Sequence, residues 1–109
     1  MKAKIRLMII NNEMLMGPGT RELLEKIDEF SSISEASKSM GMSYTKCLKM
    51  LKRTEEELGS PAVVSEKGGI SRGSTRLTPK GRQMLSDYTQ IEEKVHLYAQ
   101  QLTDEKFNF

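Results

Sequence analysis

The sequence contains no tryptophan, only three prolines and a single cysteine. One cysteine, Cys47, cannot form an internal disulfide or a cysteine-based zinc site. No apolar run approaches the roughly 20 residues that a membrane-spanning helix needs. The first residues are too short and too interrupted to act as a signal peptide. We therefore expect a cytoplasmic protein with no membrane partner.

Aromatic residues are also scarce, with three Tyr and three Phe among 109 residues, whereas Met occurs eight times. A chain of this length buries one modest core. Met side chains are flexible and fill irregular gaps. We therefore expect a single core packed largely by aliphatic and Met side chains.

Positive charge is concentrated in the middle of the chain. The formal net charge is +2, but residues 44–82 carry +5 and the remainder carries −3. A basic stretch between acidic flanks favours a surface that faces a polyanion. A solvated face with charges of both signs explains the composition equally well, so charge alone does not decide.

The N-terminal third predicts a β-hairpin followed by a helix. Ile5, Leu7 and Ile9 alternate with polar or longer residues, as in a half-buried strand, and we expect the hairpin over residues 3–16. Two strands are only marginally stable alone, so this hairpin must pack on another element. Helical spacing then continues to about Phe30.

The middle of the chain predicts two helices joined by a tight turn over residues 34–58. Ser34 and Ser43 are expected to cap them, and Gly41 is expected to permit the turn between them. Small residues on the first helix allow the second to approach closely. This order is typical of a helix-turn-helix.

Residues 61–78 predict a second β-hairpin with a glycine-rich, cationic tip, which corresponds to a wing. Thr78 then caps a long last helix that has Pro79 at its first position. We expect a fold that is mainly α with small β: a winged helix-turn-helix over residues 1–78 and a long C-terminal helix and tail over residues 79–109.

Six apolar residues of that last helix recur at spacings of four and three, as in a coiled-coil seam: Met84, Tyr88, Ile91, Val95, Tyr98 and Leu102. A helix folded back on its own domain would show the same pattern. We favour a second copy of the chain as the partner, because the rest of the sequence offers little core to cover so long a seam.

The third helix has one apolar face and one cationic face. Cys47, Leu51 and Thr54 share the apolar face, and a helix of this kind fits the major groove of DNA, which is about 12 Å wide. We expect Tyr44, Thr45 and Lys46 to meet base edges. Phosphate or flanking-base contacts are expected from Ser43, Lys49, Lys52, Arg53, Arg72, Ser74, Thr75 and Arg76.

No catalytic or metal-binding constellation is evident. Cys47 lies on an apolar helix face, which favours a small buried residue over a nucleophile. His96 has no partners for catalysis and is expected at the surface or an interface. Glu55, Glu56 and Glu57 point in different directions and are expected only to solvate a helix end. We expect neither enzymatic activity nor a cofactor.

Three stretches are similar to the N-terminal DNA-binding domain of the molybdate-responsive ModE regulators, a domain related to the LysR-type winged helix: GPGTRELLEKID, SISEASKSMGMSYTKCLKMLKRTEEELGSPAVV and LTPKGRQML. The resemblance implies a dimeric transcription factor that binds double-stranded DNA. By position, it implies DNA contacts for Ser43, Tyr44, Thr45, Lys46, Lys49 and Arg53, and on the wing for Arg72, Ser74, Thr75 and Arg76.

The sequence departs from this family in ways that change the expectation. The chain stops at Phe109, before the region that binds molybdate in the full-length regulators, so we expect no molybdate binding by this chain. Thr54 stands where these families often place a larger apolar residue. The alternative function is a winged-helix protein–protein adaptor that does not bind DNA, although its cationic third helix argues against this.

Overall fold

The computed structural model describes residues 1–66 and 74–109. The elements in chain order are β1 (Ile9–Ile10), β2 (Met14–Met16), α1 (Pro18–Phe30), α2 (Ile33–Met40), α3 (Tyr44–Leu58), β3 (Val63–Glu66), β4 (Ser74–Leu77) and α4 (Pro79–Lys106). The two antiparallel sheets have two strands each. The predicted fold class, mainly α with small β, is confirmed.

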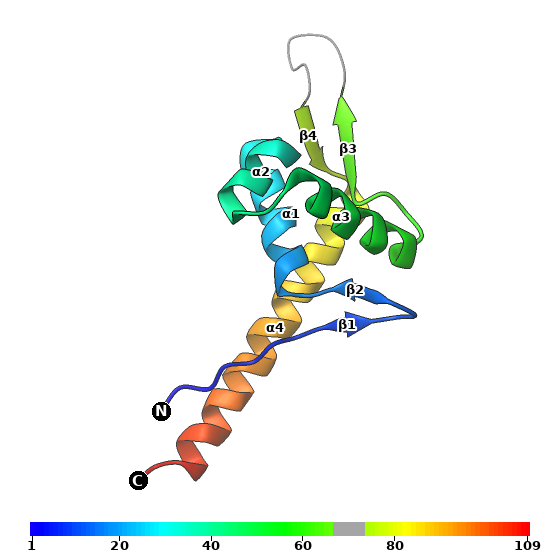
Figure 1. Cartoon of the computed structure of the whole chain (residues 1–109). Coiled ribbons are helices and arrows are strands. Elements are labelled where there is room, and N and C mark those ends of the chain that lie inside the picture. The colour runs from blue at the N-terminus through cyan, green and yellow to red at the C-terminus, as the bar shows by residue number, and fades with distance from the viewer. Residues whose placement is uncertain (67–73) are drawn as a thin grey trace.

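The molecule is elongated because α4 projects from the body formed by the other elements. The principal extents are 60, 28 and 22 Å. The inner half of α4 (residues 79–90) lies under α1 and α3, and its outer half (residues 91–106) extends away from them (Figure 1). None of the helices in the described residues combines the length and the apolar character that a membrane crossing requires.

Polar caps fix the ends of the two helices that cross in the body. Ser43 accepts a hydrogen bond from the Lys46 N–H at the start of α3, and Gly41 adopts a left-handed conformation (φ 66°) after α2, both as predicted. The predicted cap of α2 is wrong by two residues. Ser32, not Ser34, accepts the capping hydrogen bond, from the Glu35 N–H at 3.1 Å.

The N-terminal hairpin is shorter than the predicted span of residues 3–16. Only Ile9–Ile10 pairs with Met14–Met16, with an irregular register. Residues 1–8 instead form an extended segment, here called the N-terminal strap, beside the outer half of α4 (Figure 1). Gln100 holds this segment: its side-chain oxygen accepts from the Ala3 N–H at 2.8 Å, and its NH₂ donates to the Met1 carbonyl at 2.9 Å.

The core is centred on α1, whose Leu23, Leu24 and Ile27 are fully buried. Residues from every other helix and from both hairpins complete it: Met16, Ala36, Cys47, Leu51, Ala62, Leu77, Met84 and Tyr88. Burying this apolar surface supplies most of the stability of a domain of this size. Two Met residues in the cluster agree with the sulfur-rich core expected from composition.

Thr54 is fully buried on α3, yet it does not weaken the packing in the way its polarity suggests. Its hydroxyl donates a hydrogen bond to the Leu15 carbonyl in β2 at 3.0 Å. A larger apolar residue could not make this bond. Thr54 therefore joins the third helix to the N-terminal hairpin, which is the packing partner that the marginal hairpin requires.

Gly81 allows the start of α4 to approach the backbone beside β3 closely. A Cβ atom at this position would overlap the carbonyl group of Ala62. Thr78 reinforces the contact, because its N–H donates to the Ala62 carbonyl at 3.0 Å and its hydroxyl donates to Pro61 at 2.7 Å. The inner half of α4 is therefore fixed to the base of the second hairpin.

Candidate nucleic-acid interface

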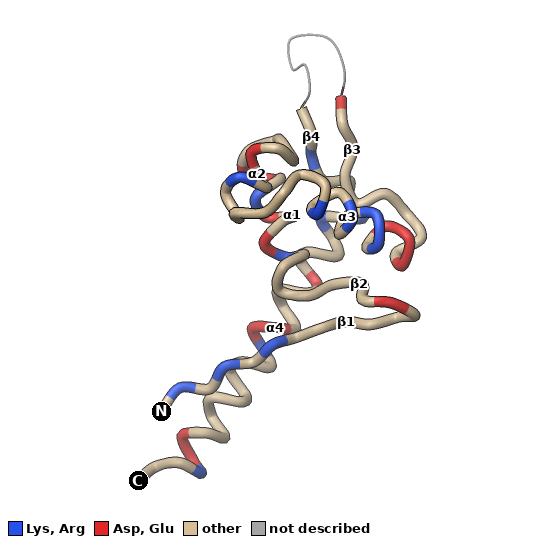
Figure 2. The backbone as a smooth tube through the Cα atoms, in the orientation of Figure 1, with Lys and Arg blue, Asp and Glu red and all other residues tan. Residues whose placement is uncertain are grey.

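Helix α3 buries one face and leaves a cationic face open. Cys47, Leu51 and Thr54 are buried, whereas Lys52 and the first turn of the helix are exposed. The exposed side includes these predicted DNA-contacting residues: Ser43, Tyr44, Thr45, Lys46 and Lys49. Arg53 is half-buried beside them. Figure 2 shows Lys and Arg side by side along α3, with acidic residues at its end.

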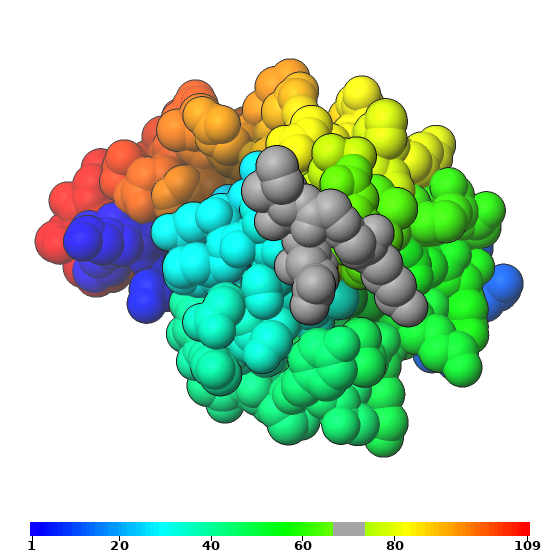
Figure 3. All heavy atoms as spheres, turned by 90° about the horizontal axis from the view of Figure 1, so that it is seen from above, coloured from blue at the N-terminus to red at the C-terminus, as the bar shows by residue number. Residues whose placement is uncertain are grey.

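Helices α2 and α3 lie next to each other on one face of the molecule. Seen from above, they form a continuous surface on the side away from α4 (Figure 3). The N-terminus of α3 opens onto this surface, and the positive end of a helix dipole favours anions there. The Ser43 hydroxyl oxygen already accepts the capping bond, which leaves its hydrogen free to donate.

The described part of the wing differs from the prediction at two residues. Thr75 is buried, its hydroxyl lies 3.0 Å from that of Ser65, and its N–H donates to the Ser31 carbonyl. Thr75 is therefore a structural link between β4 and the α1–α2 corner and is not open to a phosphate. Arg76 is exposed but forms an ion pair with Glu66 on the neighbouring strand.

Of the other predicted wing contacts, Ser74 lies within the described residues and Arg72 does not. Ser74 is half-buried at the start of β4. Arg72 and the glycine-rich tip lie outside the described residues. The predicted contact of Arg72 with DNA therefore stays a prediction.

A polar hollow that the sequence did not reveal lies between the wing strands, α2 and α3. It has a volume of about 380 Å³ and is lined by Ser32, Ile33, Ser34, Tyr44, Ser65, Glu66 and Thr75. Several of these side chains carry hydroxyl groups, which suit phosphate oxygens. Ser32 and Ser65 were missed because their role depends on the approach of the wing to α2, which is a tertiary contact.

Leu48 is also exposed on α3, with 39% of its surface open, and it lies one turn from Tyr44 and Lys52. An apolar side chain within a cationic helix face can contact the methyl group of thymine. Its exposure therefore adds a residue to the set that could distinguish one DNA sequence from another.

The acidic residues at the end of α3 do more than solvate it, contrary to the prediction. The Glu55 carboxylate accepts hydrogen bonds from the Ala62 and Val63 N–H groups at 2.7 and 3.4 Å. The Glu57 carboxylate accepts from Asn12 and Glu13 in the tip of the first hairpin, at 2.9 and 3.0 Å. These two carboxylates fix the orientation of α3 against both hairpins.

Neither Cys47 nor His96, the two residues considered for catalysis, is placed for it. Cys47 is fully buried, as predicted, and burial raises the pKa of its thiol, which outweighs the lowering effect of the Lys46 ammonium group. His96 is exposed on α4 beside Lys4 and Glu93. Within the described residues, no group of three or more His, Cys, Asp or Glu side chains is placed to hold a metal ion.

The predicted seam on α4 divides into two parts. Met84 and Tyr88 are buried and pack in the chain's own core. The prediction that these two belong to an open seam that packs on a partner helix is therefore corrected. Four residues stay open with 37–62% of their surface exposed, and we call them the apolar stripe: Ile91, Val95, Tyr98 and Leu102.

No protein-family model matches the sequence. The chain is 32% identical over 80 residues to the molybdenum-pterin-binding protein MopB of Rhodobacter capsulatus. The match covers 73% of this chain but only 30% of MopB. The similarity indicates a relationship to a molybdenum-related binding protein. The function of the remaining part of MopB does not extend to this chain.

Proposed function

We propose that this chain is a homodimeric regulator of transcription that binds specific sequences of double-stranded DNA. The observation that carries the proposal is the surface of α3, a capped helix with one face buried and a cationic face open. Its dimensions suit the major groove. Residues 1–78 supply the DNA-binding surface as a winged helix-turn-helix, and residues 79–109 supply the dimerisation helix, whose inner half also closes the core.

The helix reads bases and the flanking elements hold the backbone. Tyr44, Thr45 and Lys46 in the first turn reach base edges, since the N-terminal residues of a recognition helix enter deepest. Lys49 and Arg53 contact phosphates or flanking bases. The polar hollow beside the wing strands receives a backbone phosphate through the hydroxyl groups of Ser32 and Ser34. Glu55 and Glu57 keep the helix at a fixed angle while it does so.

The apolar stripe on the outer half of α4 pairs with the same stripe of a second copy. A surface of four large apolar side chains at coiled-coil spacing is typical of a helix that packs on another. The inner half of α4 is covered by the body of its own chain. In an antiparallel pair the two bodies lie at opposite ends, because each body surrounds only the inner half of its own α4 (Figure 1).

The relative's name links it to a molybdenum pterin, and this supports a molybdenum-related regulatory setting for the present chain. We propose that molybdate does not bind to this chain itself. Equilibrium dialysis of the protein against molybdate tests this statement, and saturable binding of one ion per chain or per dimer would contradict it.

Recovery of fragmented genomic DNA on the protein, followed by sequencing, tests the proposed function. We expect a few enriched sites that share an inverted repeat, with half-sites about 34 Å apart or a multiple of that distance. Uniform recovery that falls steeply with salt would indicate backbone binding alone. An absence of recovered DNA would favour the protein–protein adaptor.

Variants of the recovered complex locate the surface. Lys46→Ala should weaken binding to a selected site by about 1–3 kcal/mol if Lys46 reads a base. Lys26→Ala is the matched control, because Lys26 is a cation on α1 that pairs with Glu29. Equal losses in the two variants would remove α3 from the role of recognition helix.

A further inference from the structure

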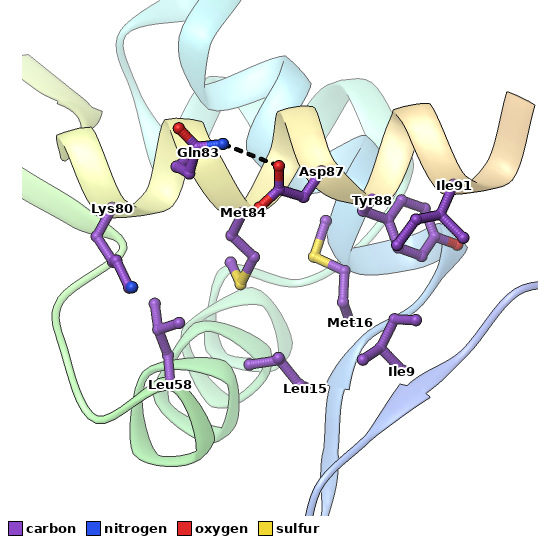
Figure 4. Close-up of a pocket in the computed structure, with 10 residues that line it drawn as sticks. All are labelled: Ile9, Leu15, Met16, Leu58, Lys80, Gln83, Met84, Asp87, Tyr88 and Ile91. Carbon is purple, nitrogen blue, oxygen red and sulfur yellow. Dashed lines mark hydrogen bonds between the residues drawn. The ribbon is translucent and has the colours of Figure 1, made fainter.

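An apolar pocket of about 220 Å³ lies at the inner half of α4, between that helix, the β1–β2 hairpin and the end of α3 (Figure 4). Its walls are mostly aliphatic or sulfur-containing: Ile9, Leu15, Met16, Leu58, Met84, Tyr88 and Ile91. Lys80, Gln83 and Asp87 form the polar rim, where Gln83 donates to Asp87 at 2.8 Å. The pocket is therefore apolar inside and open to solvent at its polar rim. We call this pocket the socket.

The socket and the apolar stripe lie on the same side of α4. Met84, Tyr88 and Ile91 line the socket at spacings of four and three, and the stripe continues from Ile91 in steps of four, three and four. Residues at such spacings share one helix face. Because Ile91 belongs to both, whatever covers the stripe passes directly over the socket.

The stripe has a spacing that reads the same in both directions. Antiparallel pairing of two stripes about their midpoint, between His96 and Leu97, sets Ile91 against Leu102 of the second copy and Val95 against Tyr98 of the second copy. The same register brings residues 107–109 of the second copy level with residues 84–86, at the socket.

Those residues include two aromatic side chains that are largely exposed. Phe107 and Phe109 are 52% and 89% exposed, and their ring centroids lie 5.9 Å apart at 55°. Two large exposed rings at the end of a helix are costly in water. An apolar cavity of about 150 Å³ accommodates one benzene ring, so the socket accepts one phenyl ring while the other packs on its rim.

We propose that the socket is the receptor for the Phe107–Phe109 pair of a second copy of this chain, and reciprocally. The inference rests on the homodimer of the proposed function, and it adds a specific seat at each end of the helix pair. It makes the dimer interface continuous with the core beneath the recognition helix, because Leu58 at the end of α3 is a wall of the socket. Dimerisation thereby supports the element that we place on DNA.

Sedimentation of the full chain and of the double variant Phe107→Ala/Phe109→Ala tests the seat. The two rings touch each other and the socket of the partner, so we expect the dimer dissociation constant to rise at least tenfold while the melting temperature of the monomer stays unchanged. An unchanged dissociation constant would overturn the proposal. The control Leu97→Ala removes an exposed apolar residue that lies off the stripe, and it should leave the dimer intact.

A cross-linking experiment reports on position independently of affinity. In a Cys47→Ala background, Gln83→Cys/Asn108→Cys keeps both rings and should give a dimer joined by disulfides under mild oxidation. The single variants Gln83→Cys and Asn108→Cys are the controls and should not cross-link, because in this register each position lies more than roughly 30 Å from its own copy at 1.5 Å per residue.

The outcomes separate the seat from the dimer and from DNA binding. A dimer that forms but does not cross-link through positions 83 and 108 overturns the seat and leaves the homodimer standing. A chain that stays monomeric at all concentrations overturns both. Either result can accompany normal binding of a single half-site, which is measured separately on DNA.

Discussion

The inner and outer halves of α4 carry the same apolar spacing but have different surroundings. Met84 and Tyr88 are at most 9% exposed, whereas Val95 and Tyr98 on the same helix face are 43% and 62% exposed. The inner half packs against α1 and the first hairpin, and among the described residues the outer half has only the N-terminal strap on one flank (Figure 1). The same spacing thus occurs on a covered face and on an open face, so spacing alone does not reveal which part of a helix its own chain covers.

The largest expected difference between the halves comes from truncating their tyrosines. Tyr88→Ala should lower the free energy of unfolding by about 3–5 kcal/mol, because it removes a buried aromatic ring from the core. Tyr98→Ala, made as the matched variant, should change the stability of the monomer by less than about 0.5 kcal/mol. Urea denaturation of both variants, at a protein concentration too low for dimers to form, measures the two free energies of unfolding. Similar losses in the two variants would contradict the distinction between the halves.

A methyl group at the start of α4 should disturb the inner half in a different way. Gly81→Ala places a Cβ against the Ala62 carbonyl group, and we expect a loss of about 1–3 kcal/mol from the forced separation. Gly19→Ala in α1 is the control, since its Cβ would meet only the Met50 methyl at 3.4 Å. There the change should stabilise the helix slightly. Thermal unfolding of the two variants should therefore shift in opposite directions.

Removing a single hydroxyl sharpens the comparison further. The Tyr88 hydroxyl donates to the Leu7 carbonyl at 2.7 Å, so Tyr88→Phe should cost about 0.5–1.5 kcal/mol. Burial, assisted by the Glu92 carboxylate, raises the pKa of Tyr88. The unfolded chain then loses this proton before the folded chain does, so stability falls as pH rises above about 10. Tyr88→Phe should flatten that alkaline decline, and an unchanged slope would contradict the assignment.

The smallest expected effect concerns an exposed ion pair on the inner half. Arg82 donates two hydrogen bonds to Asp28 on α1, at 3.2 and 2.8 Å, and these bonds lower the pKa of the Asp28 carboxyl group. The stabilisation is present above the ordinary aspartate pKa of about 3.9 and disappears as pH falls through the lower value in the folded chain. Asp28→Asn should reduce the acid dependence of the melting temperature slightly. A larger effect than that of Tyr88→Phe would reverse the ranking.

Much of the fold could be predicted from local sequence. The capping residues Ser43 and Thr78 and the left-handed Gly41 act over three or four residues, so the sequence contains the whole interaction. The choice of Ser32 over Ser34 was missed because several serines compete at that corner. The approach of Thr75 to Ser31, across more than forty residues, favours the earlier one.

The candidate site could be predicted only in part, and for the same reason. The exposure of Lys46 and Lys49 follows from the period of α3 alone. The burial of Thr75, the polar hollow beside the wing strands and the ion pair of Arg76 each depend on how distant elements meet. The division of the α4 seam likewise depends on the N-terminal hairpin, whose packing partner the sequence does not specify.

The N-terminal strap has a consequence for the way the molecule opens. Its hydrogen bonds to α4 in the described structure involve Gln100 and Tyr88, Leu7 packs against the core, and its cationic side chains are exposed. A segment with few buried apolar contacts detaches far more often than the core unfolds. Amide protons of residues 2–8 should therefore exchange with solvent long before those of α1, and trypsin should cleave after Lys4 or Arg6 while leaving the rest of the chain folded.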